Sequence, residues 1–283
     1  MTTCNPNILD NWYFIGGGSQ QGGGQFPINQ RGQATYSGNT YGIDRWNGEV
    51  GYSIVTVSAD GVNVKTSSAG HNGGIVQNIN NPASLLGKKI TTSVLYDDTF
   101  YSSTLTVPSS FSNSTFGATA PYQLGMTSGG VIYIRLKDAT TTGKTFKAVK
   151  IELGDTQTLC HNEGTTESPV WVLNEVPNYA EELAKCQRYL WVLPKYFSVR
   201  ATNLTANLIN FVFVSPTSMR SSQPTISNGF SVETITGTAQ TGFTFASLDR
   251  GNGCIYIRAT KNGHGLSDAT LMATSEIEIS AEL

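Results

Sequence analysis

The fold is decided most clearly by residues 52–65, whose sequence is YSIVTVSADGVNVK. Two runs in which β-branched residues alternate with polar residues lie on either side of Ala59-Asp60-Gly61. Asp-Gly between two such runs is a strong hairpin signal, because both central positions of the tight turn require a positive φ. The sequence therefore predicts an antiparallel hairpin at this point.

Strand-like runs of the same kind recur along the whole chain. Residues 90–96 and 100–107 flank Asp97-Asp98 and predict a second hairpin, and residues 131–136 and 146–153 each predict a further strand. Towards the C-terminus we expect strands at 208–214, 254–258 and 276–283. The first of these is apolar at nearly every position, which predicts burial on both faces. In the last, Ile277, Ile279 and Leu283 are expected to face inward.

Length and spacing predict two all-β domains of the sandwich or jelly-roll type. The chain has 283 residues, more than the roughly 100–200 residues usual for one domain. Residues 160–177 are rich in Glu, Thr, Ser, Asn and Pro, and a short helix is predicted from about Tyr179 to Leu190, with Asn178 as its cap. We expect a jelly roll at 1–158, a linker and helix at 159–190 and a β-sandwich head at 191–283.

The bulk composition excludes several classes of partner. Charged residues make up 13% of the chain, against roughly 25% in typical domains. The net charge is −2 and Lys and Arg do not cluster, so we expect no nucleic-acid partner. No apolar run is long enough for membrane insertion. The start of the chain has no secretory pattern, so we expect synthesis in a cytoplasm, with the four cysteines reduced: Cys4, Cys160, Cys186 and Cys254.

Motifs for catalysis or metal binding are not found in the sequence. The stretch 17–21, GGSQQ, fails the nucleophile-elbow pattern at its last position, and no phosphate-binding loop is present. His71, His161 and His264 are far apart in sequence, so we expect no metal and no cofactor. Acidic residues that could form a glycosidase pair lie at predicted edges and turns, and we therefore expect no enzyme activity. These residues are Glu152, Asp155, Glu163 and Glu233.

Carbohydrate binding is the chemistry for which the sequence offers the most candidates. An aromatic ring can stack on the apolar face of a sugar while amides and charged groups bond its hydroxyls. We expect Trp12 and Trp46 to pack in the core. The candidate glycan-binding residues lie near predicted loops and are expected to be exposed in the first domain, and to line a site or a subunit contact in the second. They are Tyr36, Tyr41, Tyr101 and Tyr122 in the first, and Tyr196, Arg200, Arg220, Arg250, Tyr256 and Arg258 in the second.

Several short phrases resemble a known family. Residues 7–14, 27–33 and 41–46 (NILDNWYF, PINQRGQ and YGIDRW) resemble the opening of many bacteriophage and prophage tail proteins. Residues 150–154, KIELG, look like the closing strand of their carbohydrate-binding-module-like jelly roll. Residues 179–189, YAEELAKCQRY, resemble the helix that joins this roll to a C-terminal head, and residues 219–226, MRSSQPTI, resemble a turn in that head.

This resemblance implies a receptor-binding tail protein. Such a protein would act as a homotrimer at the tail tip of the virion, beside other tail or baseplate proteins, and would bind a polysaccharide or glycan on the bacterial surface. The resemblance does not specify the sugar. Two alternatives stay open: a structural baseplate or tail-fibre component with no receptor site, and, less favoured, a polysaccharide depolymerase.

Overall fold

A computed structural model describes residues 5–16, 26–49, 51–119, 121–221, 224–249 and 254–281. The chain forms two compact units, Met1–Leu183 and Ala184–Leu283. Every strand pairing in the described residues is antiparallel, and helix α1 is the single α-helix among them. The prediction of an all-β fold of the sandwich type is confirmed.

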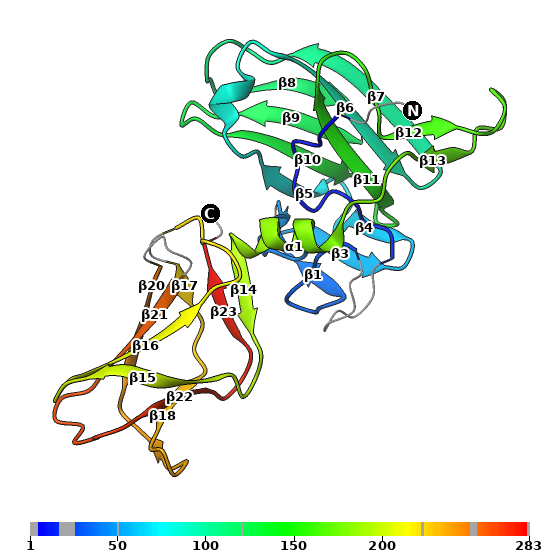
Figure 1. Ribbon diagram of the computed structural model, residues 1–283. Coiled ribbons are helices and arrows are strands. Elements are labelled where there is room, and N and C mark those ends of the chain that lie inside the picture. The colour runs from blue at the N-terminus through cyan, green and yellow to red at the C-terminus, as the bar shows by residue number, and fades with distance from the viewer. Residues whose placement is uncertain are drawn as a thin grey trace. The chain divides into compact units, whose positions relative to one another are not determined.

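The first unit is a two-layer sandwich with a small extra hairpin (Figure 1). Its six-stranded sheet has the order β1 (Thr35–Ser37), β3 (Ser53–Ser58), β4 (Gly61–Thr66), β11 (Lys144–Leu153), β6 (Lys89–Tyr96) and β7 (Thr99–Thr106). Its five-stranded sheet has the order β2 (Asn47–Gly48), β5 (Gly73–Asn78), β10 (Ile132–Asp138), β9 (Tyr122–Met126) and β8 (Ser114–Thr119). A 3-10 turn, Pro82–Leu85, precedes β6. Both predicted hairpins are confirmed, as β3–β4 and β6–β7.

The core of the first unit lies between these two sheets. Alternate residues of each strand face inward, as the period of two requires; Ile75 and Ile134 do so from one sheet and Val64 from the other. Trp12 and Trp46 are also buried in this core, as predicted. Burial of so many aliphatic and aromatic side chains supplies the main driving force for folding.

A buried polar network fixes the segment that leads into β2. The Arg45 Nε donates to Asp10 Oδ2 over 3.1 Å. The side-chain amide of Asn11 donates to the carbonyls of Ile28 and Asp44, and the Trp46 indole N–H donates to the Asn11 carbonyl. Buried polar groups are tolerated only when their hydrogen bonds are made, so this network holds residues 44–46 in one position.

The segment expected to be a linker contains regular structure. Strands β12 (Cys160–Asn162) and β13 (Trp171–Leu173) form a hairpin within the first compact unit. The fully buried Lys150 of β11 bonds Thr158 Oγ1 at 3.0 Å and pairs with Glu175. These contacts attach both ends of the hairpin segment to the six-stranded sheet.

Helix α1 spans Tyr179–Gln187 and has the predicted cap. The Asn178 Oδ1 accepts hydrogen bonds from the backbone N–H groups of Ala180 and Glu181 at 2.9 and 3.3 Å. The helix ends three residues earlier than expected, because Leu190 already begins strand β14.

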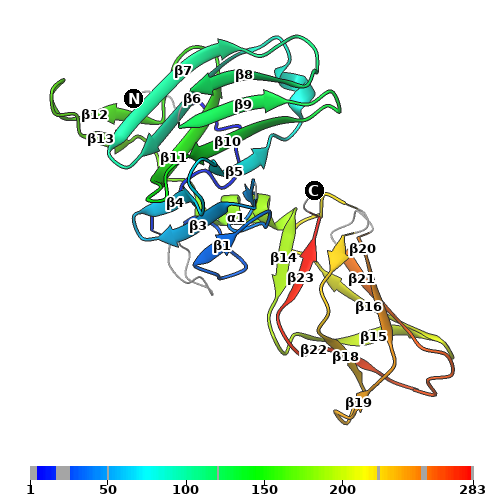
Figure 2. The same ribbon diagram turned by 180° about the vertical axis from the view of Figure 1, so that it is seen from behind.

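The second unit has its own core between a small and a large sheet (Figure 2). The small sheet has the order β14 (Leu190–Leu193), β23 (Ile277–Ser280) and β17 (Thr225–Ile226). The large sheet has the order β19 (Ala239–Gln240), β18 (Phe230–Glu233), β22 (Thr270–Ala273), β15 (Ser198–Leu204), β16 (Leu208–Val214), β21 (Cys254–Thr260) and β20 (Thr244–Asp249). Ile277 and Ile279 face inward as predicted, and Leu283 lies outside the described residues.

Strand β16 corrects one prediction. Its apolar sequence predicted burial on both faces, yet burial alternates along it and Val214 is 75% exposed. Ile209 and Phe211 enter the core, whereas Val212 and Val214 lie on the opposite face. β-branched residues are favoured on a pleated, half-buried strand surface, so an unbroken apolar run overstated the burial.

Candidate functional site

A polar and aromatic patch lies on the outer face of the five-stranded sheet. Strand β10 alternates strictly, so Ile132, Ile134 and Leu136 enter the core while Tyr133 and Arg135 point outward. A cavity of about 430 Å³ opens over these two side chains. We call it the sheet-face site. It is lined by Asn39, Asn47, Gly48, Glu49, Val76, Asn78, Tyr133 and Arg135.

Strand register brings these residues together from distant parts of the sequence. Arg135 of β10 is opposite Val76 of β5, which in turn is opposite Asn47 of β2. Tyr133 is opposite Asn78 of β5 and, on its other side, opposite Gly125 of β9. Directly opposed side chains on one face of a sheet lie within about 5.5 Å at Cβ, so the site is built on rigid strands.

Gly125 makes room for the ring of Tyr133. A Cβ atom at position 125 would lie 2.3 Å from the Tyr133 hydroxyl oxygen and 2.4 Å from Cζ. The phenol end of the ring therefore lies directly against the backbone of β9. Glycine in a strand often marks such a close approach. The result is an aromatic ring held on the sheet surface at the wall of the cavity.

Arg135 is held in place by three neighbours. Its guanidinium pairs with Glu49, its Nη1 donates to Gln123 Oε1 at 3.0 Å, and its Cζ lies 5.7 Å from the centre of the Tyr133 ring. Burial raises the pKa of Glu49 above its ordinary value, and the charge of Arg135 acts in the opposite direction. The guanidinium is thus fixed in a partly dehydrated position.

Two polar atoms of the site have no hydrogen-bond partner in the described part of the chain. They are Asn47 Oδ1, an acceptor, and Arg135 Nε, a donor, and both are shielded from solvent. An unsatisfied buried polar group costs about 1–3 kcal/mol. A hydroxyl group both donates and accepts, so it matches either kind of atom. The donor set therefore suits a polyhydroxylated ligand.

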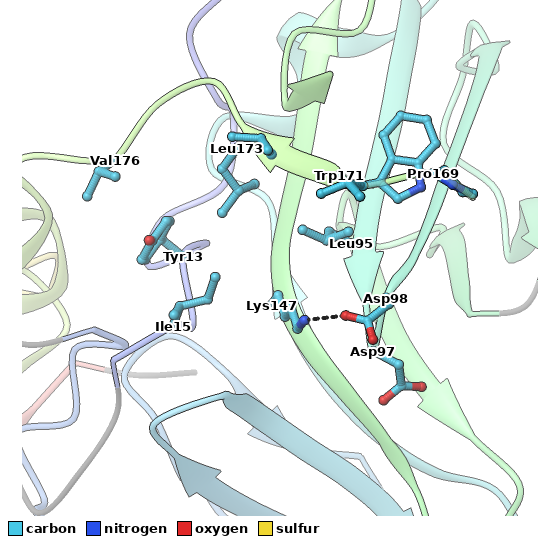
Figure 3. A pocket seen from close by; sticks show the side chains of 12 residues that line it. Tyr13, Ile15, Leu95, Asp97, Asp98, Lys147, Pro169, Trp171, Leu173 and Val176 are labelled. Atoms are coloured by element: carbon cyan, nitrogen blue, oxygen red, sulfur yellow. Dashed lines mark hydrogen bonds and ion pairs between the residues drawn. The ribbon is translucent and has the colours of Figure 1, made fainter. Parts of the chain in front are cut away.

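A second, larger cavity of about 640 Å³ lies elsewhere in the first unit (Figure 3). We call it the edge groove. Its walls are mostly apolar, and a Lys147–Asp98 ion pair of 2.9 Å lies at one side. It is lined by Tyr13, Ile15, Leu95, Asp97, Asp98, Lys147, Pro169, Val170, Trp171, Val172, Leu173 and Val176.

The four tyrosine candidates of the first unit lie outside the sheet-face site. Tyr36 and Tyr122 are 6% and 1% exposed, so the expectation of exposure is wrong for both. Tyr36 is opposite Val55 in the sheet and bonds Asn29 through its hydroxyl, and its pKa is raised to about 12 by burial. Tyr122 packs against the half-buried Tyr101, with ring centres 5.8 Å apart. The sequence around these tyrosines is rich in turn residues, and this pattern did not predict that their rings point inward.

A small pocket of about 290 Å³ does bring two of these candidates together. It is lined by Arg31, Gln33, Thr35, Tyr36, Ser37, Thr40 and Tyr41. The Arg31 Cζ lies 5.8 Å from the centre of the half-buried Tyr41 ring. The Tyr36 hydroxyl in this pocket is already bonded to Asn29.

The candidates of the second unit are dispersed. Tyr256 and Arg258 lie on the outer face of β21, opposite Val212 and Asn210 of β16. Arg200 is exposed on β15, two strands away from β21.

The remaining described candidates of this unit lie at other positions. Tyr196 is 70% exposed in the turn before β15, with Lys195 Nζ 4.7 Å from its ring centre. Arg220 lies over the Tyr189 ring at 5.5 Å. Arg250 lies outside the described residues.

The residues of the sheet-face site were not predicted from the sequence, although a signal was present. The alternation in residues 131–136 predicts that Tyr133 and Arg135 share the face opposite Ile132 and Ile134. An aromatic and an arginine two residues apart on an outward face are candidates for binding. Asn47 and Glu49 gave no comparable signal, because only the pairing of β2 with β5 brings them to this face.

The described residues show little sign of other site chemistry. Within these ranges, no group of three or more His, Cys, Asp or Glu side chains could hold a metal ion. Cys160 and Cys254 are free thiols. None of the described helices is both long and apolar enough to cross a membrane.

Comparison with known proteins identified no relative of this chain. No family model matches the chain, and no curated protein or solved structure matches it significantly.

Proposed function

We propose that this chain binds carbohydrate at the sheet-face site and acts, without catalysis, as a receptor-binding tail protein of a bacteriophage or phage-like particle. The observation that carries the carbohydrate-binding part is the Tyr133 ring lying beside Arg135 in a cavity that Asn47 also lines; Arg135 and Asn47 both have unpartnered polar atoms. An aromatic surface next to fixed amide and guanidinium groups is the combination that recognises a sugar ring and its hydroxyls.

The charge of the site favours a neutral sugar. The Arg135 guanidinium is neutralised by the carboxylate of Glu49, and the other polar side chains lining the cavity are the amides of Asn39, Asn47 and Asn78. A strongly anionic ligand would need an unpaired cationic group. We therefore expect neutral hexoses or acetamido sugars in preference to sulfated or phosphorylated ones.

The tail-protein part of the proposal rests on the resemblance of the short phrases given above. A shallow site of this kind binds a single sugar weakly, and a trimer on one particle would raise the avidity through effective concentration without any new contact. Light scattering on the purified chain tests this part. Three chains per particle support it, and a monomer at micromolar concentration contradicts it.

A glycan array probed with the full-length chain tests the site. We expect binding to a small group of related bacterial glycans, and loss of that binding in Tyr133→Ala. Tyr52→Ala is the matched control, because Tyr52 is 43% exposed, stacks on His71 and does not line the site.

Two results would count against the proposal. Unchanged array binding in Tyr133→Ala would remove the sheet-face site from it. Absence of binding by the wild-type chain, together with no block of phage adsorption to host cells, would favour a purely structural role.

A further inference from the structure

Strand β13 has an unpaired edge. It pairs only with β12 among the described strands. The hydrogen bonds from Glu163 N–H to the Val170 carbonyl and from Asn174 N–H to the Leu159 carbonyl, both 2.9 Å, fix the phase of the ladder. Bonded pairs alternate along an antiparallel ladder, so Val172 bonds to β12. The N–H and C=O groups of Trp171 and Leu173 therefore point away from β12.

The edge groove runs along this unpaired edge. It is lined by every residue from Pro169 to Leu173 and by no residue of β12. Successive side chains of a strand point to opposite faces. This cavity contacts consecutive residues of β13, whose side chains point to both faces, and it lies on the side of β13 away from β12. It therefore follows the backbone edge of the strand. Figure 3 shows β13 as the wall of this cavity, with Tyr13, Ile15 and Leu95 nearby.

The side chains around the groove have an apolar part and an acidic part. Val170 and Val176 are 56% and 67% exposed, an apolar surface that water contacts unfavourably. At the other part lie Asp97 and Asp98, with Lys147 as the single cation among the lining residues. Two carboxylates and one ammonium leave a net negative charge there.

We propose that the edge groove receives an extended segment of a partner protein as a strand added to β13. The segment would carry apolar side chains at alternate positions and a basic residue next to the Asp97-Asp98 end. Main-chain hydrogen bonds to Trp171 and Leu173 would supply affinity, and the alternating side chains and the charge would supply specificity. This site is distinct from the sheet-face site and does not depend on carbohydrate binding.

Amide hydrogen exchange on the full-length chain tests the strand addition. The probe is a short peptide of alternating Thr and Val with Lys at both ends, and the control peptide carries Glu at both ends. In the free protein the Trp171 and Leu173 amides should exchange quickly and the Val172 amide slowly. The Lys probe should slow exchange at Trp171 and Leu173 by at least about tenfold and leave Val172 unchanged. Equal exchange at these amides with up to roughly 2 mM probe overturns the proposal.

Charge variants test the orientation of the groove. Asp98→Lys should weaken binding of the Lys probe, measured by fluorescence polarisation, at least about fivefold, because it reverses the charge beside the groove. Asp155→Lys is the matched control: Asp155 is also an exposed partner of a lysine, Lys89, and does not line the groove.

Three other results would also contradict the proposal. These are equal weakening by the two charge variants, equal affinity for the Lys and Glu peptides, and protection of these amides by a sugar instead of a peptide. Tyr133→Ala should leave probe binding unchanged, so failure here is separable from failure of carbohydrate binding.

Discussion

Replacing Gly125 with Ala should disable the sheet-face site while leaving the fold intact. The added Cβ would lie 2.3 Å from the Tyr133 hydroxyl oxygen, and ordinary contact begins at 3.4 Å. The phenol end of the ring must therefore move by about 1.1 Å, the difference between these distances. A binding site tolerates displacements of only about 0.5 Å. We expect glycan affinity to fall at least about tenfold, which corresponds to about 1.4 kcal/mol.

The same substitution should have little effect on stability. Gly125 does not have a positive φ, so Ala fits its backbone, and a Gly→Ala change at a compatible position gains about 0.4–1 kcal/mol by restricting the unfolded chain. Displacement of the half-buried Tyr133 ring works against this gain. We therefore expect the free energy of unfolding in urea to stay within about 1 kcal/mol of the wild-type value.

Calorimetric titration with the glycan selected on the array measures the affinity, and urea unfolding measures the stability. Gly51→Ala is the control, because a Cβ at Gly51 meets nothing within 4 Å. The reasoning is refuted if Gly125→Ala binds as tightly as Gly51→Ala. It is also refuted if affinity and stability fall together, since the loss would then reflect unfolding.

Three further predictions concern stability and pH. Lys150→Met should lower the free energy of unfolding by about 3–5 kcal/mol, because it leaves the buried Glu152 without its cation; a loss below about 1 kcal/mol in urea unfolding would contradict this. Asn178→Ala should cost about 1 kcal/mol by removing the cap of α1, with Asn178→Asp as the variant that restores stability. Because burial raises the pKa of Glu49, its protonated form stabilises the fold below the unfolded pKa of 4.5, and this contribution is lost as the pH rises through the folded pKa. Glu49→Gln should remove that part of the pH dependence, and an unchanged profile would exclude Glu49 as its source.

Local patterns predicted much of the fold. The Asp60-Gly61 turn and the alternating runs on either side of it produced the β3–β4 hairpin, because turn geometry and side-chain period depend only on neighbouring residues. The cap of α1 at Asn178 follows in the same way. The hairpin β12–β13 was missed, because its strands are only three residues long and its stability depends on buried contacts such as Lys150 with Thr158.

The candidate site was less predictable than the fold. Side-chain alternation placed Tyr133 and Arg135 on one face, but a local pattern does not say what opposes that face. The missing information is register: Asn47 reaches Arg135 only through Val76, across two strand pairings that join distant parts of the sequence. Proximity to turns was a poor guide to exposure, since Tyr36 and Tyr122 are buried although they lie close to loops.

The two proposed sites differ in what the protein offers a ligand, and this difference follows from their positions on the sheets. In the interior of a sheet, β10 is paired with β5 on one side and with β9 on the other, so a ligand on this face meets side chains such as Tyr133 and Arg135. At the edge of β13, the backbone itself is available beside an apolar wall. A sugar, with hydroxyls in many directions, suits the first arrangement. An extended peptide, with one row of donors and acceptors, suits the second.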